Sequence, residues 1–246
     1  MKTRVKRVLN VMVTAVLVLG ILFFSSLSVK EYLPYVKNRI RTERLQKEAA
    51  GRDEEGRRKI NWKKLQKKNK DIIAWIEIPG TKVDYPIVKC PSRSYYLHHD
   101  AEGRNSILGA IFVQPETAGD FSDIHTVIYG HNMRDKQMFG SLHSFEKKDF
   151  WKKHKKIYIY QPEQEIEAAV YSTYDILDST DTYRTTFDTP DEWEEWIAMT
   201  IEKRYYDTGI DPENTGQIIT LSTCSNGRGR RSRYVVNCVV ESVRTF

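Results

Sequence analysis

The chain has 246 residues, 40% of them hydrophobic and 11% aromatic, and a formal net charge of +6. This length and apolar content are enough to bury one sizeable core with further segments attached to it. The charge is uneven, because residues 1–70 hold 19 basic and 6 acidic side chains whereas residues 71–246 hold 20 basic and 27 acidic ones. The three cysteines, Cys90, Cys224 and Cys238, are an odd set without metal-ligand spacing, which argues against a disulfide scaffold and a zinc site.

The N-terminal residues predict a membrane anchor. Four of the first seven residues are basic, and Val8–Val29 follows without a charged side chain. As a helix this run spans roughly 33 Å, which matches the hydrocarbon thickness of a bilayer. A cleaved signal peptide is the alternative, because three serines stand near the end of the run. The run exceeds a secretory apolar core, so we expect a cytoplasmic tail over 1–7, a single-pass transmembrane helix over 8–29 and the remainder outside the cell.

Residues 30–70 form a basic segment with helical character. We expect a helix over Glu31–Arg58, interrupted at Gly51 and Gly56, and a short second helix over Trp62–Asn69. Beside a membrane, such a segment favours contact with anionic lipid headgroups or anionic wall polymers over nucleic acid. A solvated helix without a partner is the plain alternative.

From Ile72 onward the apolar pattern changes to short runs of β-branched and aromatic residues separated by turn residues. Eight strands with few helical stretches between them favour a closed β-barrel over a parallel α/β sheet, because closure leaves no exposed edge. We therefore expect residues 71–246 to form a mostly β, eight-stranded barrel preceded by N-terminal helices. The expected strands are 72–78, 83–88, 106–113, 126–129, 156–160, 166–177, 217–224 and 233–243.

One long helix is expected between the sixth and seventh strands. Thr189 and Pro190 are typical of a helix start, acidic residues follow, and the helical pattern continues to about Tyr206. Its apolar stripe has the i, i+3, i+4, i+7 spacing of a buried helix face and consists of Trp193, Trp196, Ile197 and Thr200.

The last two expected strands bring a thiol and a guanidinium together. Cys224 ends one apolar run and Arg233 opens the next, and the polar stretch between them predicts an antiparallel pair with a long hairpin loop. Side chains two apart share a face of a strand, so Ser222 and Cys224 point the same way. Cys238 is five positions from Arg233 and, without a bulge, points oppositely, as a buried thiol rather than a second catalyst.

The segment Thr220-Leu221-Ser222-Thr223-Cys224, followed by Arg233, resembles the active-site segment of the sortases, cysteine transpeptidases of Gram-positive cell surfaces. The resemblance covers about Asn69 to Phe246. The family's histidine is expected at His131, just past the strand that ends in Tyr129-Gly130. The helices before the barrel and the long helix between strands six and seven make the chain most similar to class B sortases.

The resemblance implies a role for each of these residues. Cys224 is the nucleophile, and His131 is its proton acceptor and later the acid that protonates the departing amine. Arg233 binds the substrate backbone or the oxyanion, and the Ser225 backbone N–H is a candidate second donor. Arg228, Arg230 and Arg231 are alternatives for the arginine. The resemblance also suggests four substrate-binding residues: Leu97, Tyr129, Ser222 and Thr223.

A class B sortase cleaves a surface protein after the threonine of a C-terminal sorting motif, forms a thioester, and joins the protein to an amine of the peptidoglycan cross-bridge or its precursor. This implies no cofactor and, without a matching acidic cluster, no metal. A secreted Cys/His peptidase or hydrolase is one alternative, although in papain-like hydrolases the cysteine precedes the histidine and begins a helix. A non-enzymatic membrane-anchored surface scaffold is the other.

Overall fold

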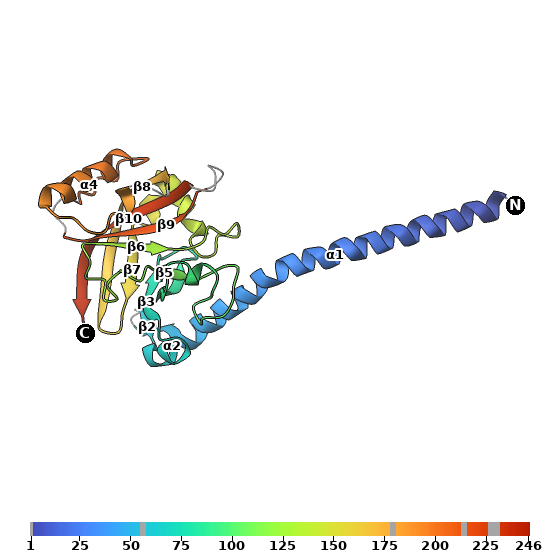
Figure 1. Ribbon diagram of the computed structural model, residues 1–246, viewed down its shortest axis with the longest axis horizontal. Coiled ribbons are helices and arrows are strands. Elements are labelled where there is room, and N and C mark those ends of the chain that lie inside the picture. The colour runs from blue at the N-terminus through green and yellow to red at the C-terminus, as the bar shows by residue number, and fades with distance from the viewer. Residues whose placement is uncertain (1, 55–57, 178–180, 213–215, 226–231) are drawn as a thin grey trace. The chain divides into compact units, whose positions relative to one another are not determined.

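The computed structural model describes residues 2–54, 58–177, 181–212, 216–225 and 232–246 (Figure 1). The chain divides into two compact units, one ending at Glu43 and the other running from Arg44 to Phe246.

The first unit contains the helix α1 (Lys2–Ala49) as far as Glu43, and the last turns of this helix belong to the second unit (blue in Figure 1). Its apolar side chains from Val8 to Val29 are exposed, and the helix is long and apolar enough to cross a membrane by length and composition. We expected separate anchor and stalk helices, but α1 runs through both and includes Pro34. A proline disfavours a helix interior, but the residues that follow it as far as Ala49 are mainly good helix formers such as Lys, Arg, Glu and Leu, and the first glycine after it is Gly51.

A small hairpin replaces the end of the expected stalk helix. β1 (Ala50–Arg52) pairs antiparallel with β2 (Arg58–Ile60). The side chain of Arg58 is 8% exposed and forms ion pairs with Glu77, at 3.2 Å, and with Asp84. These contacts with the barrel hold the segment in the hairpin. The helical prediction for this stretch was wrong because a pattern of neighbouring residues does not show distant ion pairs.

α2 (Trp62–Lys68) forms where the second short helix was expected. The Asn61 side chain caps it by accepting the Lys64 backbone N–H at 3.0 Å. Leu65 is fully buried in a cluster with Leu45 and Ala49 of the last turns of α1.

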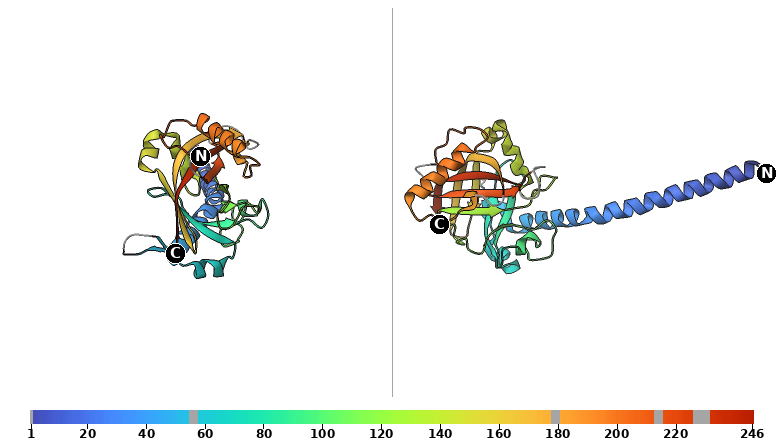
Figure 2. Two further views of the ribbon diagram at one scale, coloured as in Figure 1. Left: turned by 90° about the vertical axis from the view of Figure 1, so that its left-hand side faces the viewer. Right: turned by 45° about the horizontal axis from the view of Figure 1, so that its top comes forward.

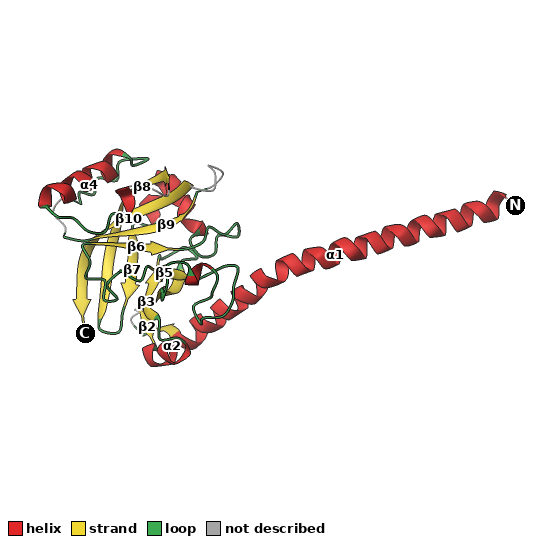
Figure 3. Ribbon diagram, viewed as in Figure 1, coloured by secondary structure: helices red, strands yellow, loops and turns green. Residues whose placement is uncertain are grey.

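The second unit contains the expected eight-stranded closed barrel (Figures 1 and 3). Neighbouring strands are antiparallel except for the parallel pairs β4–β5 and β6–β9. Around the barrel the order is β10-β8-β7-β3-β4-β5-β6-β9. The strands are β3 (Ile72–Glu77), β4 (Asp84–Lys89), β5 (Ile111–Val113), β6 (His125–Tyr129), β7 (Lys156–Tyr160), β8 (Gln164–Leu177), β9 (Ile218–Cys224) and β10 (Ser232–Thr245).

β5 is shorter than the predicted strand over 106–113. Residues 106–110 form turns, in which the Gly109 N–H donates to Ser106 O at 3.3 Å and the Ala110 N–H donates to Tyr96 O at 3.0 Å. Gly109 has a φ of +58°, which a strand does not accommodate. Tyr96 belongs to the 3₁₀ turn η1 (Tyr95–Leu97), which lies beside this segment.

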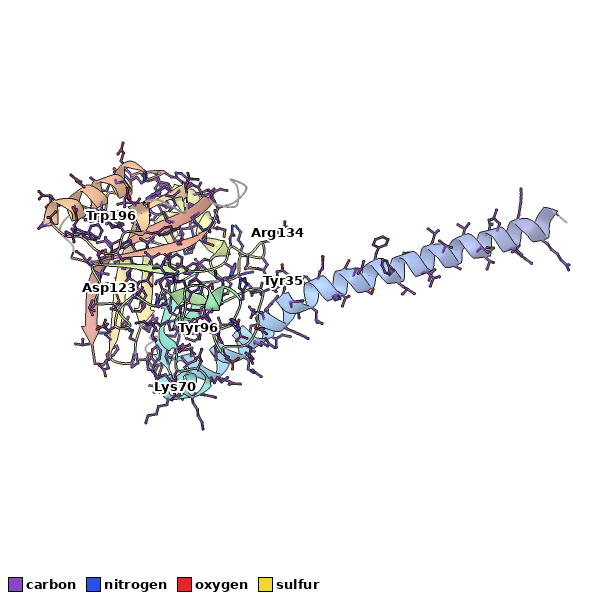
Figure 4. All side chains as sticks on the ribbon, viewed as in Figure 1. Tyr35, Lys70, Tyr96, Asp123, Arg134 and Trp196 are labelled. Atoms are coloured by element: carbon purple, nitrogen blue, oxygen red, sulfur yellow. The ribbon has the colours of Figure 1, made fainter. Side chains whose placement is uncertain are left out.

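α4 (Pro190–Glu202) lies between β8 and β9 in the chain and covers the outside of the barrel (Figure 2). Thr189 caps it by accepting the Glu192 backbone N–H at 3.3 Å. The predicted stripe is buried, with the ring of Trp196 (labelled in Figure 4) 4.4 Å from that of His125. The helix ends before the predicted Tyr206, and the Tyr205 N–H donates to Thr173 O of β8 at 3.0 Å.

The sequence did not predict the helical turns between β6 and β7. These are η2 (Gly140–Glu146) and α3 (Lys148–Lys153), and they bury Leu142, Phe145 and Trp151 in the barrel core. A short 3₁₀ turn, η3 (Asp181–Tyr183), follows β8.

Candidate active site

The ends of β9 and β10 place Cys224 opposite Arg233. Ser225 and Ser232 are the next pair, and the Ser225 N–H donates to Ser232 O at 3.0 Å. Since hydrogen-bonded and non-hydrogen-bonded pairs alternate in an antiparallel ladder, Cys224 and Arg233 form a non-hydrogen-bonded pair, with Cα atoms about 4.5 Å apart. Side chains are closest in such pairs, so the side chains of Cys224 and Arg233 leave neighbouring strands at the same level. Arg233 Nη1 donates to Ser232 O at 3.2 Å.

β6 brings His131 to the same place. It runs parallel to β9 with Tyr129 level with Ser222, and the Gly130 N–H donates to Ser222 O at 3.1 Å. Continued by two residues, this register places residue 131 level with Cys224. The imidazole and the thiol therefore leave adjacent strands at one end of the barrel.

A backbone carbonyl of η1 orients the His131 ring. Its Nε2 lies 3.0 Å from Leu97 O. Because a carbonyl only accepts, Nε2 carries a proton, and in the neutral ring Nδ1 is the basic nitrogen. Nδ1 is therefore the atom of His131 that can exchange a proton in the cleft.

Two glycines make room for this arrangement. A Cβ at Gly109 would lie 2.6 Å from Tyr96 O and 2.8 Å from His131 Cδ2. A Cβ at Gly130 would lie 2.5 Å from Ile111 Cδ1 and 2.7 Å from Cδ2 of the Phe139 ring. Real Cβ atoms essentially never come this close to other heavy atoms. A side chain at Gly109 or at Gly130 would therefore force neighbouring atoms, including those around His131, to move.

A cleft of about 620 Å³ opens at this end of the barrel. All seven residues that the sequence suggested as catalytic or substrate-binding line it: Leu97, Tyr129, His131, Ser222, Thr223, Cys224 and Arg233. Of the three cysteines, all of which lie in the described part of the chain, Cys224 is the exposed one. Arg228, Arg230 and Arg231 lie outside the described residues.

The cleft also contains residues that sequence reasoning missed. Tyr183 of η3 reaches in from the segment between β8 and α4, and its hydroxyl lies 2.7 Å from Ser222 Oγ. Arg93 pairs with Glu116, and Arg184 pairs with Glu192 at the start of α4. No local sequence pattern marks these residues, because it is the folding of the barrel that brings their distant segments to the cleft. The full additional lining is Arg93, Phe112, Gln114, Glu116, Thr117, Val127, Gly130, Tyr183, Arg184, Thr185 and Thr186.

Cys238 has the environment expected of a packing residue. It is fully buried in the main core cluster, and burial raises the pKa of its thiol. Cys90 is also buried, and burial raises the pKa of that thiol too. Neither side chain lines the cleft.

The expected role of the Ser225 backbone was wrong. Its N–H donates to Ser232 O in the ladder and is not directed at the cleft. Arg233, which is opposite Cys224 in the ladder, also lines the cleft and carries several N–H donors.

Comparison with known proteins identifies the family. The family model of the sortase domain matches residues 76–241, which include all eight barrel strands in whole or in part. The chain belongs to the sortase family. Sortase B of Listeria monocytogenes is 32% identical to this sortase over 180 residues, which are 72% of each chain. Sortase B of Staphylococcus aureus is 28% identical over 235 residues, 95% of this chain and 96% of the relative.

Solved structures place it in the same class. Sortase B of B. anthracis in complex with AAEK1 superposes with a TM-score of 0.74 at 28% identity, covering 85% of this chain and 98% of that one. A Staphylococcus aureus sortase B-substrate complex superposes with a TM-score of 0.72 at 25% identity, with the same coverage. The chain is a class B sortase and thus a cysteine transpeptidase, not a papain-like hydrolase or a scaffold without activity.

Proposed function

We propose that this sortase uses Cys224, His131 and Arg233 to transfer a surface protein from its C-terminal sorting motif to a cell-wall amine. The Cys224 thiolate attacks the carbonyl carbon of the motif's threonine, and the C–N bond to the next residue breaks. His131 takes the thiol proton on Nδ1 and gives it to the departing amine, and a thioester remains on Cys224. An amine of the peptidoglycan cross-bridge or its precursor then attacks the thioester carbonyl and gives its proton to His131, and the C–S bond breaks to release the Cys224 thiolate.

Arg233 is proposed to stabilise the oxyanion or hold the substrate backbone. Its guanidinium is charged at every physiological pH and has several donors in a fixed fork. Its position opposite Cys224 supports this role, and so does the commitment of the Ser225 N–H to the ladder. Leu97, Tyr129, Ser222 and Thr223 are the proposed substrate contacts, since all four line the cleft.

The single observation that carries the proposal is the exposed Cys224 in a cleft that His131 and Arg233 also line, each of the three from a different strand or strand end. Acyl transfer needs such a shared cleft, because the nucleophile, the proton-transfer group and the substrate carbonyl have to be held close together at the same time.

The test uses the full-length protein in detergent with peptides that carry Asn-Pro, Ser-Pro or Leu-Pro sorting motifs. Intact-protein mass spectrometry is expected to show an acyl adduct on the wild type, and an added amine is expected to convert it to a ligated peptide. Cys224→Ala should form no adduct. An adduct of normal yield in that variant would refute the mechanism, and release of a free threonine carboxylate despite abundant amine would indicate a hydrolase.

The location is also proposed. We infer that residues 8–29 anchor the protein by a single pass, with residues 1–7 in the cytoplasm and the barrel outside the cell; the uncharged run and the preceding basic residues support this. The proposed partners are surface proteins with a sorting motif, the amine acceptor and the membrane.

The topology is tested on intact cells. Protease added to these cells should digest the barrel of the membrane-bound protein. Protection of the barrel, or its recovery in the culture medium, would contradict the topology.

A further inference from the structure

The backbone carbonyl of Cys224 has an unusual set of partners. In a non-hydrogen-bonded pair with Arg233, the Cys224 carbonyl points away from β10 and toward β6. Two residues earlier, Ser222 O accepts a regular ladder bond from the Gly130 N–H. β6 ends at Tyr129, so beyond that bond the ladder supplies no further donor to β9 on this side.

Two side chains take the place of the missing ladder donor. Asn132 Nδ2 lies 2.8 Å and His143 Nε2 lies 2.9 Å from Cys224 O. These two nitrogens are 3.1 Å apart, within hydrogen-bond distance of each other, so a ring without a proton on Nε2 would accept from Asn132, whereas a ring with a proton there donates to Cys224 O. His143 comes from η2, which the sequence did not predict, and it had no identifiable partner in the sequence.

Both ring nitrogens of His143 face acceptors. Nε2 meets the Cys224 carbonyl, and Nδ1 lies 2.7 Å from Glu146 Oε1. A carbonyl and a carboxylate only accept, so a ring that donates in both contacts carries a proton on each nitrogen. This is the imidazolium form, and its partner carboxylate is one turn away on the same element.

The surroundings of His143 favour a fixed ring. Its side chain is 2% exposed, and it stacks on Tyr234 of β10 with ring centroids 4.5 Å apart. Burial raises the pKa of Tyr234, so this neighbour is a neutral phenol whose π face suits a cation. Among the described residues, the groups recorded against the ring are Glu146, Asn132, Tyr234 and the Cys224 carbonyl.

We propose that His143, held as an imidazolium by Glu146, is a positioning residue that fixes the backbone of Cys224 and favours its thiolate. The proposal rests on the proposed role of Cys224 as the nucleophile. The two donors hold the carbonyl where the strand would otherwise fray next to the long hairpin loop. The positively charged ring contacts the backbone of the same residue that carries the sulfur. A positive charge near the sulfur stabilises the thiolate more than the thiol.

The test measures the thiolate directly in the full-length protein in detergent. The rate of alkylation of Cys224 by iodoacetamide is followed against pH, with peptide-resolved mass spectrometry to separate it from the buried Cys90 and Cys238. In His143→Gln the midpoint is expected to rise by about half a unit to one unit. In Glu146→Gln, which keeps an acceptor but removes the charge, it is expected to rise by less, since that side chain is 43% exposed.

A kinetic readout and a matched control accompany it. In His143→Gln, kcat is expected to fall about tenfold while KM stays within about twofold, because the substrate contacts are unchanged. The control is His154→Gln, which removes a bond between a histidine nitrogen and a backbone carbonyl, Pro79 O at 2.8 Å, remote from the cleft. It should leave both the alkylation midpoint and kcat unchanged.

An unchanged midpoint in folded His143→Gln would overturn the proposal. If that variant does not fold, the ¹⁵N side-chain shifts of His143 in the wild type decide, since a neutral ring at pH 7 would also overturn it. Failure of the proposed function is distinguishable from failure of this inference. A wild type that forms no acyl adduct, while its alkylation midpoint still responds to His143, refutes the reaction and not the contact.

Discussion

The two ends of β6 each carry or adjoin a histidine, and the two residues have opposite environments. His125 at the start of the strand is fully buried, with Nδ1 donating to Arg184 O at 2.6 Å and Nε2 2.8 Å from Thr220 Oγ1. His131, two residues past the end, lines the cleft and makes one bond to a backbone carbonyl. Inside the ladder both ring nitrogens are therefore used for structure, whereas beyond the end of the ladder one ring nitrogen remains for the proposed proton transfer.

The largest expected effect is at the cleft end of this strand. His131→Ala should lower the rate of peptide cleavage by about a hundredfold to ten-thousandfold, since the proposed base and acid, Nδ1, is lost. The free energy of unfolding should change by less than about 1 kcal/mol, because the ring is partly exposed and makes one hydrogen bond. Peptide turnover and urea unfolding measure the two quantities. A variant that is destabilised but active per folded molecule would contradict the comparison.

The buried end should show itself in the pH dependence of stability. Burial lowers the pKa of His125 to about 4. Between its unfolded value near 6.5 and this folded value, the unfolded chain binds a proton that the folded chain does not, so stability falls as pH falls, by about 3 kcal/mol in total. Above pH 6.5 this contribution is complete. Urea midpoints measured at pH 6.5 and pH 5 test this. Carboxylates whose pKa is lowered, such as Glu192, change their contribution to stability only at lower pH, so they do not obscure the effect of His125 in this range.

The matched variant for that measurement is His125→Gln, which does not titrate. Its overall stability should be lower, because glutamine does not reproduce the geometry of the two hydrogen bonds that His125 makes to Arg184 O and Thr220 Oγ1. Its loss of stability between pH 6.5 and 5 should be smaller than that of the wild type. Equal pH slopes in the two proteins would show that His125 is not the group responsible.

A smaller effect on turnover, combined with a moderate loss of stability, is expected at Gly109. In Gly109→Ala the positive φ is strained and the new Cβ meets Tyr96 O and the His131 ring, so the variant should lose about 1–3 kcal/mol of stability. Displacement of the ring should lower kcat by about tenfold to a hundredfold. Thermal unfolding and peptide turnover measure these. Gly119→Ala is the control, since its Cβ would meet nothing within 4 Å and its φ is not in the left-handed region.

The smallest effect concerns the helix that covers the buried end. Thr189→Ala removes the cap of α4, whose Trp196 packs against His125, and should cost about 1 kcal/mol of stability. Turnover per folded molecule should not change, because Thr189 does not line the cleft. Thr189→Ser keeps the hydroxyl and should behave like the wild type. A loss of kcat in Thr189→Ala would show that the two ends of the strand are coupled.

The sequence predicted the features that follow from the alternation of side chains along a strand and from the periodicity of a helix. Cys224 and Arg233 are paired because they flank one hairpin, and the buried stripe of α4 follows from the spacing of Trp193 and Trp196. The barrel itself follows from the number of strands and the few helices between them.

The rest depends on contacts between distant segments. The β1–β2 hairpin is held by Arg58 on Glu77 and Asp84, and Tyr183 enters the cleft from a segment 39 residues before Ser222. His143 contacts Cys224 across 81 residues. Such pairings leave no periodic signal in a single sequence, which is why the helical turn that carries His143 was not predicted.

The closing strand has a consequence for the timing of synthesis. β10 pairs with both β8 and β9 and carries Arg233, so the barrel closes only when this strand has been synthesised. Until then the growing chain has the thiol of Cys224 without the strand that faces it. We expect a chain truncated before Arg233 to lack a closed barrel and to be inactive rather than partly active.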